Sequence, residues 1–338
     1  MESVRARPVV AGGLAAVALI VVIAAVVVLR PGAGPEATGP APAVPVASPA
    51  PETVRIVESR EIGERTRDLT IHSPALGRAA RARVLLPRGW RPGSGPWPVL
   101  YLLHGCCDPD HLGWDGKGGA DELTAGAPVI VVIPEGGSVG FYSDWLNGPR
   151  WETFHLTELL GVVEKEYGAG DRRAVAGLSM GGFGAMSYAA RHPGMFQAAA
   201  SFSGVLDTEA GLQGVMRLIQ DNGLNPGDLW GYPGGDGDSW AAHNPSRLVS
   251  ALKGVRLFVS AGNGEPGPLD GPAATEDAGE RNLLSQSRTF TERARAAGLT
   301  VETYFYGKGT HTWPYWKRSL ERALPGLLTA LEVRPSGE

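Results

Sequence analysis

A serine stands at the centre of the sequence G-L-S-M-G at residues 177–181. The apolar run 174–176 before it predicts a buried strand. The stretch 182–190 after it predicts a helix that ends before Pro193, because a proline disfavours helical geometry in the residue before it. Glycines allow the sharp strand-to-helix turn that exposes a nucleophilic hydroxyl. The pattern therefore predicts that Ser179 is a nucleophile; the alternative is a glycine-rich turn whose serine does no chemistry.

A serine hydroxyl is a weak nucleophile at neutral pH, so a general base and an orienting acid must come from elsewhere in the chain. Where a nucleophile lies on such a turn, the chain order is Ser, then Asp or Glu, then His. Of the seven histidines, only His243 and His311 lie far enough downstream. His243 precedes Asn-Pro in a predicted surface turn. We predict His311 as the base, because it lies in a glycine-flanked loop after the alternating strand 301–305.

The acid should follow the strand predicted at residues 257–260. Glu265, Asp270 and Glu280 all meet this condition, and spacing alone does not separate them. The acid would fix the tautomer of the imidazole and stabilise the imidazolium that forms during attack.

The apolar run 98–103 predicts another buried strand, which ends at His104. The loop after this strand and the residue after the nucleophile each supply one backbone N–H of an oxyanion hole. These positions are Cys106 and Met180. Loss of one such donor commonly costs about 3 kcal/mol of transition-state stabilisation. The predicted chemistry is acyl transfer through a seryl ester.

The elements that must hold these residues alternate between strands and helices after residue 99, which predicts an α/β domain with a mostly parallel sheet and helices on both faces. Strands are predicted at 54–59, 67–71, 80–86, 99–103, 129–133, 173–176, 198–203, 255–260 and 301–305. Helices are predicted at 151–166, 179–191, 209–221, 276–297 and 316–333.

From about Ile71 to Leu328 the chain resembles the antigen 85 mycolyltransferases and their actinobacterial esterase relatives, within the α/β-hydrolase superfamily. The matching stretches keep the same order along the chain: 73–78, 136–145, 151–154, 177–180, 262–264 and 309–316. The resemblance implies an α/β-hydrolase fold and carboxylic-ester substrates. In that family the acid is a glutamate that leads a helix, with a phenylalanine ten residues later. Glu280 and Phe290 match this pattern, so the resemblance selects Glu280, and it agrees with the two oxyanion donors.

Two departures from the family bear on the acceptor. Members that transfer mycolates to trehalose carry an aspartate before the first-loop glycine and an arginine after the oxyanion residue; here these positions are His104 and Cys107. Water is therefore favoured slightly over a sugar as the acceptor. His104 is a candidate substrate contact, with backbone bonding as the alternative. Trp313 is a candidate platform for a sugar ring, with simple packing as the alternative. The apolar positions of the helix at 212–219 would line an acyl groove, or else pack on the domain.

The cysteines, Cys106 and Cys107, are adjacent, so they cannot form a long-range disulfide. We expect two small residues in the oxyanion loop; a redox gate on that loop is the alternative. The formal net charge of −4 and the absence of a basic stripe exclude nucleic acid as an expected partner. Neither a metal nor a cofactor is predicted, because the calcium-like stretch 234–239 lacks the required spacing and distal carboxylate.

The N-terminus predicts the location of the protein. Residues 9–29 are apolar or small and long enough to span a bilayer, with arginines before and after. We predict a signal anchor at 1–30, a proline-rich linker at 31–53 and a catalytic domain at 54–338. The protein would be a single-pass membrane protein with this domain outside the cytoplasm; the alternative is cleavage and secretion.

The sequence thus predicts a membrane-anchored serine hydrolase or acyltransferase that acts on lipid or other acyl esters. The first alternative is a mycolyltransferase-type enzyme with a sugar or glycerol acceptor. A peptidase would need an extended peptide site, of which the sequence shows no sign. A catalytically silent envelope-binding protein is the remaining alternative, against which the Ser179 and His311 patterns argue.

Overall fold

The computed structural model describes residues 52–107, 111–234 and 239–333. These residues belong to the second of two units, residues 51–338. The predicted anchor and nearly all of the proline-rich linker lie outside the described residues. Within the ranges described, no helix has both the length and the apolar character needed to cross a bilayer.

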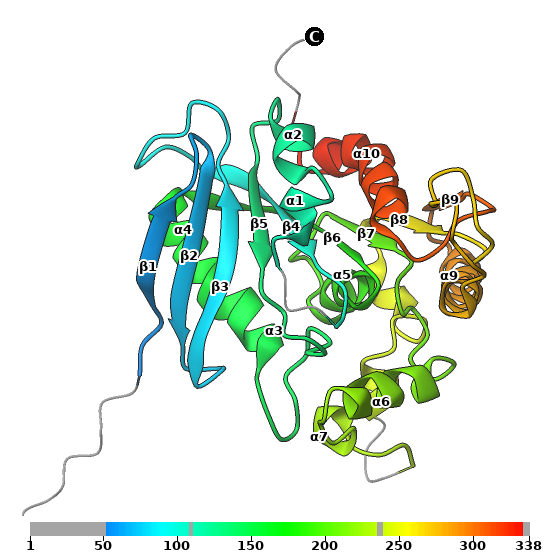
Figure 1. The fold of residues 1–338 in the computed structure, drawn as a ribbon. Helices are drawn as coiled ribbons and strands as arrows, with labels where there is room; N and C mark the ends of the chain where they lie inside the picture. The colour runs from blue at the N-terminus through cyan, green and yellow to red at the C-terminus, as the bar shows by residue number, and fades with distance from the viewer. Residues whose placement is uncertain (1–51, 108–110, 235–238, 334–338) are drawn as a thin grey trace, which may run out of the picture. The chain divides into compact units, whose positions relative to one another are not determined.

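A single nine-stranded sheet runs through the unit in the order β1-β2-β3-β5-β4-β6-β7-β8-β9 (Figure 1). The pairs that join β1, β2, β3 and β5 are antiparallel, and every pair from β5 to β9 is parallel. The strands are β1 (Arg55–Glu61), β2 (Thr66–Ser73), β3 (Arg78–Leu85), β4 (Trp97–Leu103), β5 (Ile130–Pro134), β6 (Ala169–Leu178), β7 (Ala198–Phe202), β8 (Arg256–Ala261) and β9 (Val301–Phe305).

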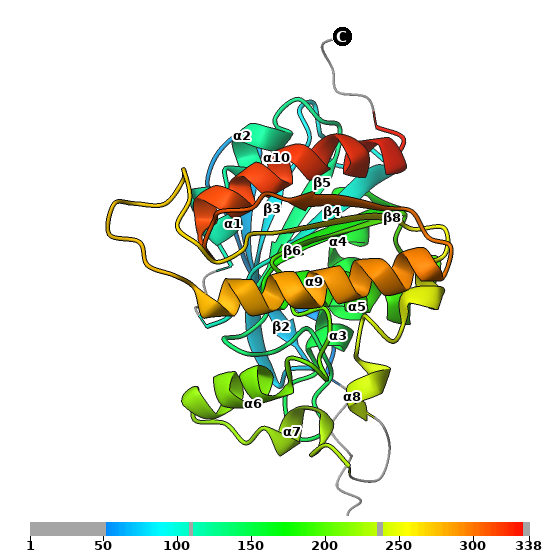
Figure 2. The ribbon, with the colours of Figure 1, turned by 90° about the vertical axis from the view of Figure 1, so that its right-hand side faces the viewer.

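Both faces of the central strands β4, β5, β7 and β8 are buried, which explains their nearly continuous apolar runs, whereas the edge strand β9 is partly exposed. In β4, Val99 and Tyr101 join one core, and Leu100 and Leu102 join the other. The first core packs under α3 (Trp151–Thr153), η1 (Phe154–Leu159), α4 (Leu160–Tyr167), α5 (Met180–Arg191) and α9 (Ala278–Ala296). The second packs under α1 (Gly113–Gly116), α2 (Ala120–Thr124) and α10 (Trp313–Ala330). Figure 2 shows α9 and α10 on opposite sides of the sheet.

Every strand and helix predicted from the sequence is present, and the predicted sheet is confirmed. The boundaries differ locally for physical reasons. Helix α5 begins after Ser179, which has a positive φ of 53°. Helix α10 begins three residues earlier than predicted, because Pro314 fits the first turn of a helix, where no intrahelical N–H is needed. The helix predicted at 151–166 contains a π-helical segment, η1, between two α-helical parts.

Between β7 and β8 the chain leaves the sheet to form an insertion, residues 204–252. It holds α6 (Leu212–Asp221), α7 (Gly227–Trp230), α8 (Ser239–Ala242) and the 3-10 helix η2 (Val249–Leu252). Figures 1 and 2 both show α6 and α7 set away from the sheet. Helix α6 buries only Val215 and Ile219, so one of its faces packs and the other is open.

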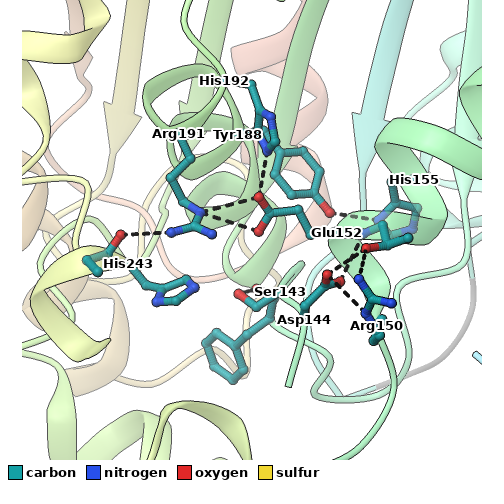
Figure 3. Close-up of polar contacts among 12 residues, drawn as sticks. Ser143, Asp144, Arg150, Glu152, His155, Tyr188, Arg191, His192 and His243 are labelled. Carbon is teal, nitrogen blue, oxygen red and sulfur yellow. Dashed lines mark hydrogen bonds and ion pairs between the residues drawn. The ribbon is translucent and has the colours of Figure 1, made fainter. Parts of the chain in front are cut away.

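A polar network joins the start of α3 to the end of α5 and to the insertion (Figure 3). The buried Glu152 accepts hydrogen bonds from His192 Nε2 at 2.6 Å and from Arg191 Nε at 3.3 Å. Arg191 also donates to the carbonyl of Ala242 in α8 at 3.1 Å. Burial alone would raise the pKa of Glu152, but the hydrogen bond from His192 and the charge of Arg191 lower it, so the carboxylate stays charged.

His155 lies in the same region, and its two ring nitrogens bond to other segments of the fold. Its Nε2–H donates to the carbonyl of Glu135 at 2.8 Å, and its Nδ1 accepts from the Tyr188 hydroxyl at 2.8 Å. Burial lowers the pKa of His155 to about 4, so the ring is neutral. His243 stacks on Trp230 with 4.8 Å between ring centroids, and burial lowers its pKa to about 4 as well. Both histidines therefore have structural partners away from Ser179.

Candidate active site

Ser179 lies at the junction of β6 and α5 with φ 53° and ψ −119°. A positive φ is uncommon for a residue other than glycine and persists only where the surroundings enforce it. Here the backbone N–H of Ser179 donates to Phe202 in β7 at 2.9 Å, and its carbonyl accepts from Phe183 in α5 at 3.1 Å. The serine is thus held in the turn from both sides.

Glycines around the serine permit contacts between backbones. A Cβ at Gly181 would lie 2.2 Å from the carbonyl oxygen of Leu103, at the end of β4. One at Gly105 would lie 2.6 Å from Leu178 Cδ1 and 3.2 Å from Ser179 Cβ. The loop after β4 therefore lies directly against the turn, as the oxyanion-hole prediction requires.

The predicted base and acid are in direct contact. His311 Nδ1 and Glu280 Oε2 are 2.7 Å apart, and Glu280 is fully buried. Its other oxygen, Oε1, accepts from the Ser203 hydroxyl and the Gly262 N–H, both at 2.7 Å, and from the Tyr306 hydroxyl at 3.3 Å. A buried carboxylate needs such donors. An imidazole Nδ1–H that donates to a carboxylate leaves Nε2 as the ring nitrogen that can accept a proton.

The other two acids considered from the sequence have different partners. Glu265 forms an ion pair with Lys308 at 3.2 Å. Asp270 accepts hydrogen bonds from the Thr310 hydroxyl, from the Gly267 N–H at 2.8 Å and from the Tyr315 hydroxyl at 2.9 Å. Burial would raise the pKa of Asp270, but these bonds lower it. Asp270 thus supports the loop that carries His311, and of the three acids only Glu280 is bonded to the imidazole.

Two cavities meet at Ser179. One, of about 360 Å³, is lined by Trp313, Trp316, Lys117 and Gly113 among others; we call it the tryptophan pocket. The other, of about 720 Å³, runs between α6 and α9; we call it the α6–α9 groove. Three residues line both cavities: Cys106, Ser179 and His311. The predicted nucleophile and base therefore line the same two cavities, although they are far apart in the sequence.

The two predicted oxyanion donors flank this junction. Met180 is the first residue of α5, and N–H groups in the first turn of a helix have no partner within the helix. Cys106 lies on the loop after β4 and lines both cavities. Its side chain is half-buried, that of Cys107 is exposed, and neither thiol is in a disulfide. Burial, and then the neighbouring Cys107, raise the pKa of Cys106, so this thiol remains protonated.

The two predicted substrate contacts differ in their surroundings. His104 is buried; its Nε2 accepts from the Gly136 N–H at 2.8 Å and its Nδ1–H donates to the Gly105 carbonyl at 2.7 Å. Both ring nitrogens thus bond to backbone groups, so the ring connects the loop after β4 to the loop after β5. Trp313 is half-buried; its ring packs edge-on against Trp114, with 5.4 Å between centroids, and lines the tryptophan pocket.

Sequence reasoning missed three residues that contact the acid–base pair. Ser203, with φ 48°, and Tyr306 donate to Glu280, and Asp277 accepts from the backbone of His311. Burial and then the nearby Glu280 charge raise the pKa of Tyr306, so its hydroxyl stays a donor. The one available signal was position: Ser203 and Tyr306 each follow a parallel strand at its carboxyl end, where active sites of open α/β sheets form.

Comparison with known proteins relates this site to a family. The family model described as "Putative esterase" matches residues 73–327. Esterase Rv1288 of Mycobacterium tuberculosis is 37% identical over 265 residues, which cover 74% of this chain and 57% of that protein. The chain therefore spans little more than half the length of that relative. Ag85B of Mycobacterium intracellulare, a diacylglycerol acyltransferase/mycolyltransferase, is 32% identical over 290 residues, or 80% of this chain and 84% of that protein.

Solved structures agree with these relatives. MPT51 (FbpC1) of Mycobacterium tuberculosis superimposes with a TM-score of 0.66 at 28% identity, covering 77% of this chain and 96% of that one. An S-formylglutathione hydrolase from Agrobacterium tumefaciens gives a TM-score of 0.64 at 17% identity, covering 82% and 99%. The latter bears on the fold alone. The α/β-hydrolase fold and the family resemblance predicted from the sequence are confirmed.

The backbone contact at Gly181 makes a stability prediction. Gly181→Ala should destabilise the protein by roughly 2–3 kcal/mol, because the new methyl group would overlap the carbonyl of Leu103. Gly161→Ala is the matched control: this glycine lies in α4 with nothing within 4 Å of a Cβ, so alanine should stabilise by up to about 1 kcal/mol. Urea unfolding of both variants measures the difference. Equal stabilities would contradict the close approach of the turn to β4.

Proposed function

The chain belongs to this esterase family, and from that premise we propose that it is a serine esterase or acyltransferase in which Ser179, His311 and Glu280 form the catalytic triad. The observation that carries the proposal is the junction of the two cavities. Ser179 and His311 line both of them, and behind the junction the imidazole is bonded to a fully buried carboxylate at 2.7 Å.

The chemistry follows from these positions. His311 Nε2 takes the hydroxyl proton as Ser179 Oγ attacks the ester carbonyl. The backbone N–H groups of Met180 and Cys106 bind the oxyanion of the tetrahedral intermediate. The intermediate collapses when the C–O bond to the alcohol breaks and His311 returns the proton to the departing oxygen. Water or another alcohol then attacks the seryl ester with the same base.

Throughout this cycle Glu280 orients the imidazole and balances its positive charge. An imidazolium beside a fully buried carboxylate is stabilised because little solvent screens the pair. The carboxylate itself is held by donors from three segments: Ser203 after β7, Gly262 after β8 and Tyr306 after β9. The charge needed in the transition state is therefore in place before substrate binds.

The two cavities suit the two halves of an ester. The α6–α9 groove is the larger, and Val215, Leu218 and Leu283 give it apolar walls, so we assign it to the acyl chain. The tryptophan pocket would take the alcohol. No carboxylate belongs to its lining among the described residues, and the ring nitrogens of His104 bind backbone. A sugar would therefore be held weakly, which favours hydrolysis.

Transfer to a sugar or glycerol is the second candidate. The half-buried Trp313 offers an indole face to the pocket, and stacking on such a face is a common way to hold a sugar ring. The similarity to Ag85B also favours it.

The first test is ester turnover by wild type and Ser179→Ala. We expect hydrolysis of acetyl, butyryl, decanoyl and palmitoyl esters of 4-methylumbelliferone by wild type, and a loss on the order of 10⁴-fold or more in the variant. Mass spectrometry with trehalose or glycerol present would detect transfer products, which would make the protein an acyltransferase. Absence of turnover, together with no fluorophosphonate labelling of wild type, would instead identify a silent binding protein. Preference for amide over ester substrates would identify a peptidase.

A second test addresses the acid. Glu280→Gln should lower kcat by about 10³-fold or more, because an amide neither fixes the imidazole tautomer nor balances its charge. Glu265→Gln is the matched control, since its carboxylate pairs with Lys308, and it should retain wild-type kcat. Kinetics with a butyryl ester would measure kcat, and circular dichroism would show whether each variant is folded. Equal losses of kcat in the two variants would contradict the proposed role of Glu280 in the triad.

We also propose that the protein is exported and stays attached to the membrane through residues 9–29, with the proline-rich linker as a spacer. The uninterrupted apolar stretch supports this location. In the native host, the full-length protein should remain in membranes after alkaline carbonate extraction, and protease added to intact spheroplasts should degrade the catalytic domain. Recovery of a shortened protein from the culture medium would show cleavage and secretion.

A further inference from the structure

Asp277 lies immediately before α9, the helix that carries Glu280. Its Oδ1 accepts a hydrogen bond from the Glu280 N–H at 2.9 Å and so caps the first turn of the helix. Its Oδ2 accepts from the backbone N–H of His311 at 3.0 Å. One carboxylate thus joins the backbone of the acid to the backbone of the base. Figure 2 shows that α9 and α10, which follow Asp277 and His311 respectively, cover opposite faces of the sheet but begin at the same end of it, on the left of the view.

Asp277 is itself fixed by the loop after β8. Its N–H donates to the carbonyl of Gly264 at 2.7 Å. Gly264 has a φ of +79°, and a Cβ there would lie 2.1 Å from the carbonyl oxygen of Asp277. This close approach of two backbones leaves the aspartate little freedom. Its two oxygens therefore set the distance between the start of α9 and the His311 loop.

We infer that Asp277 is a positioning residue for the proposed triad, on which this inference rests. An ordinary helix cap needs one oxygen, and the second here reaches a different segment, at the residue that carries the imidazole. The bond between Glu280 and His311 fixes only the ring. The backbone bond from Asp277 fixes the point from which the ring extends, and so its distance from Ser179. A misplacement of about 1 Å at such a position commonly reduces turnover by about 100-fold.

The test distinguishes the hydrogen bond that Asp277 accepts from Glu280 from the one that it accepts from His311. Asp277→Ser keeps a cap, because a serine hydroxyl also accepts from an N–H of the first turn, but its single oxygen cannot hold His311 as well. Asp277→Ala loses both bonds. Glu276→Gln is the matched control, because it removes the exposed neighbouring charge, which pairs with Arg281 at 2.9 Å.

We expect kcat of Asp277→Ser for a butyryl ester to fall at least tenfold with KM unchanged, and the rate of Ser179 phosphonylation by a fluorophosphonate to fall in parallel. Its Tm should stay close to that of wild type, and Asp277→Ala should lose both Tm and kcat. Glu276→Gln should match wild type. Wild-type kcat in Asp277→Ser, or a loss fully explained by its unfolded fraction, would overturn the inference. An active Ser179→Ala would instead overturn the proposed triad.

Discussion

The carboxylate of Glu280 is buried away from water, and the end of the sheet that holds the proposed triad is organised around it. Such a charge is tolerated only when its oxygens are saturated by donors. Here the donors come from the chain just after β7, β8 and β9 and from His311. Each of these donors follows a parallel strand. The register of the strands therefore determines where the carboxylate can lie, and the carboxylate in turn helps to hold that register. The fold and the chemistry thus share a single electrostatic requirement.

A second constraint, which is steric, acts on the proposed nucleophile, Ser179. Ser179 adopts a strained conformation because β6 must turn into α5 while the loop after β4 lies against the same turn. The glycines remove side chains where backbones meet. The electrostatic constraint acts on His311, and the steric constraint acts on Ser179. The two residues therefore line the same two cavities, although they lie far apart in the sequence.

Much of this arrangement was predictable from the sequence, for identifiable reasons. The turn at Ser179 has a local signature, and alternating apolar runs locate the strands, because both signals come from neighbouring residues. Glu280 was not separable from Glu265 and Asp270 by spacing, since the loop before α9 has no regular geometry; the family resemblance supplied the choice. Ser203, Tyr306 and Asp277 went unnoticed because their partners lie on other segments and leave no periodic pattern. The same holds for the ring of His104, whose two backbone partners only the fold brings together.

The loop after β4 is independent of the bonds that hold the buried carboxylate. The family resemblance places His104 and Cys107 where trehalose-using members carry an aspartate and an arginine, and among the described residues none of the donors to Glu280 comes from this loop. The two positions are therefore unlike: the buried His104 ring is bonded to Gly105 and Gly136, whereas the Cys107 side chain is exposed. A substitution at Cys107 would change this edge of the loop without removing a donor from the buried carboxylate.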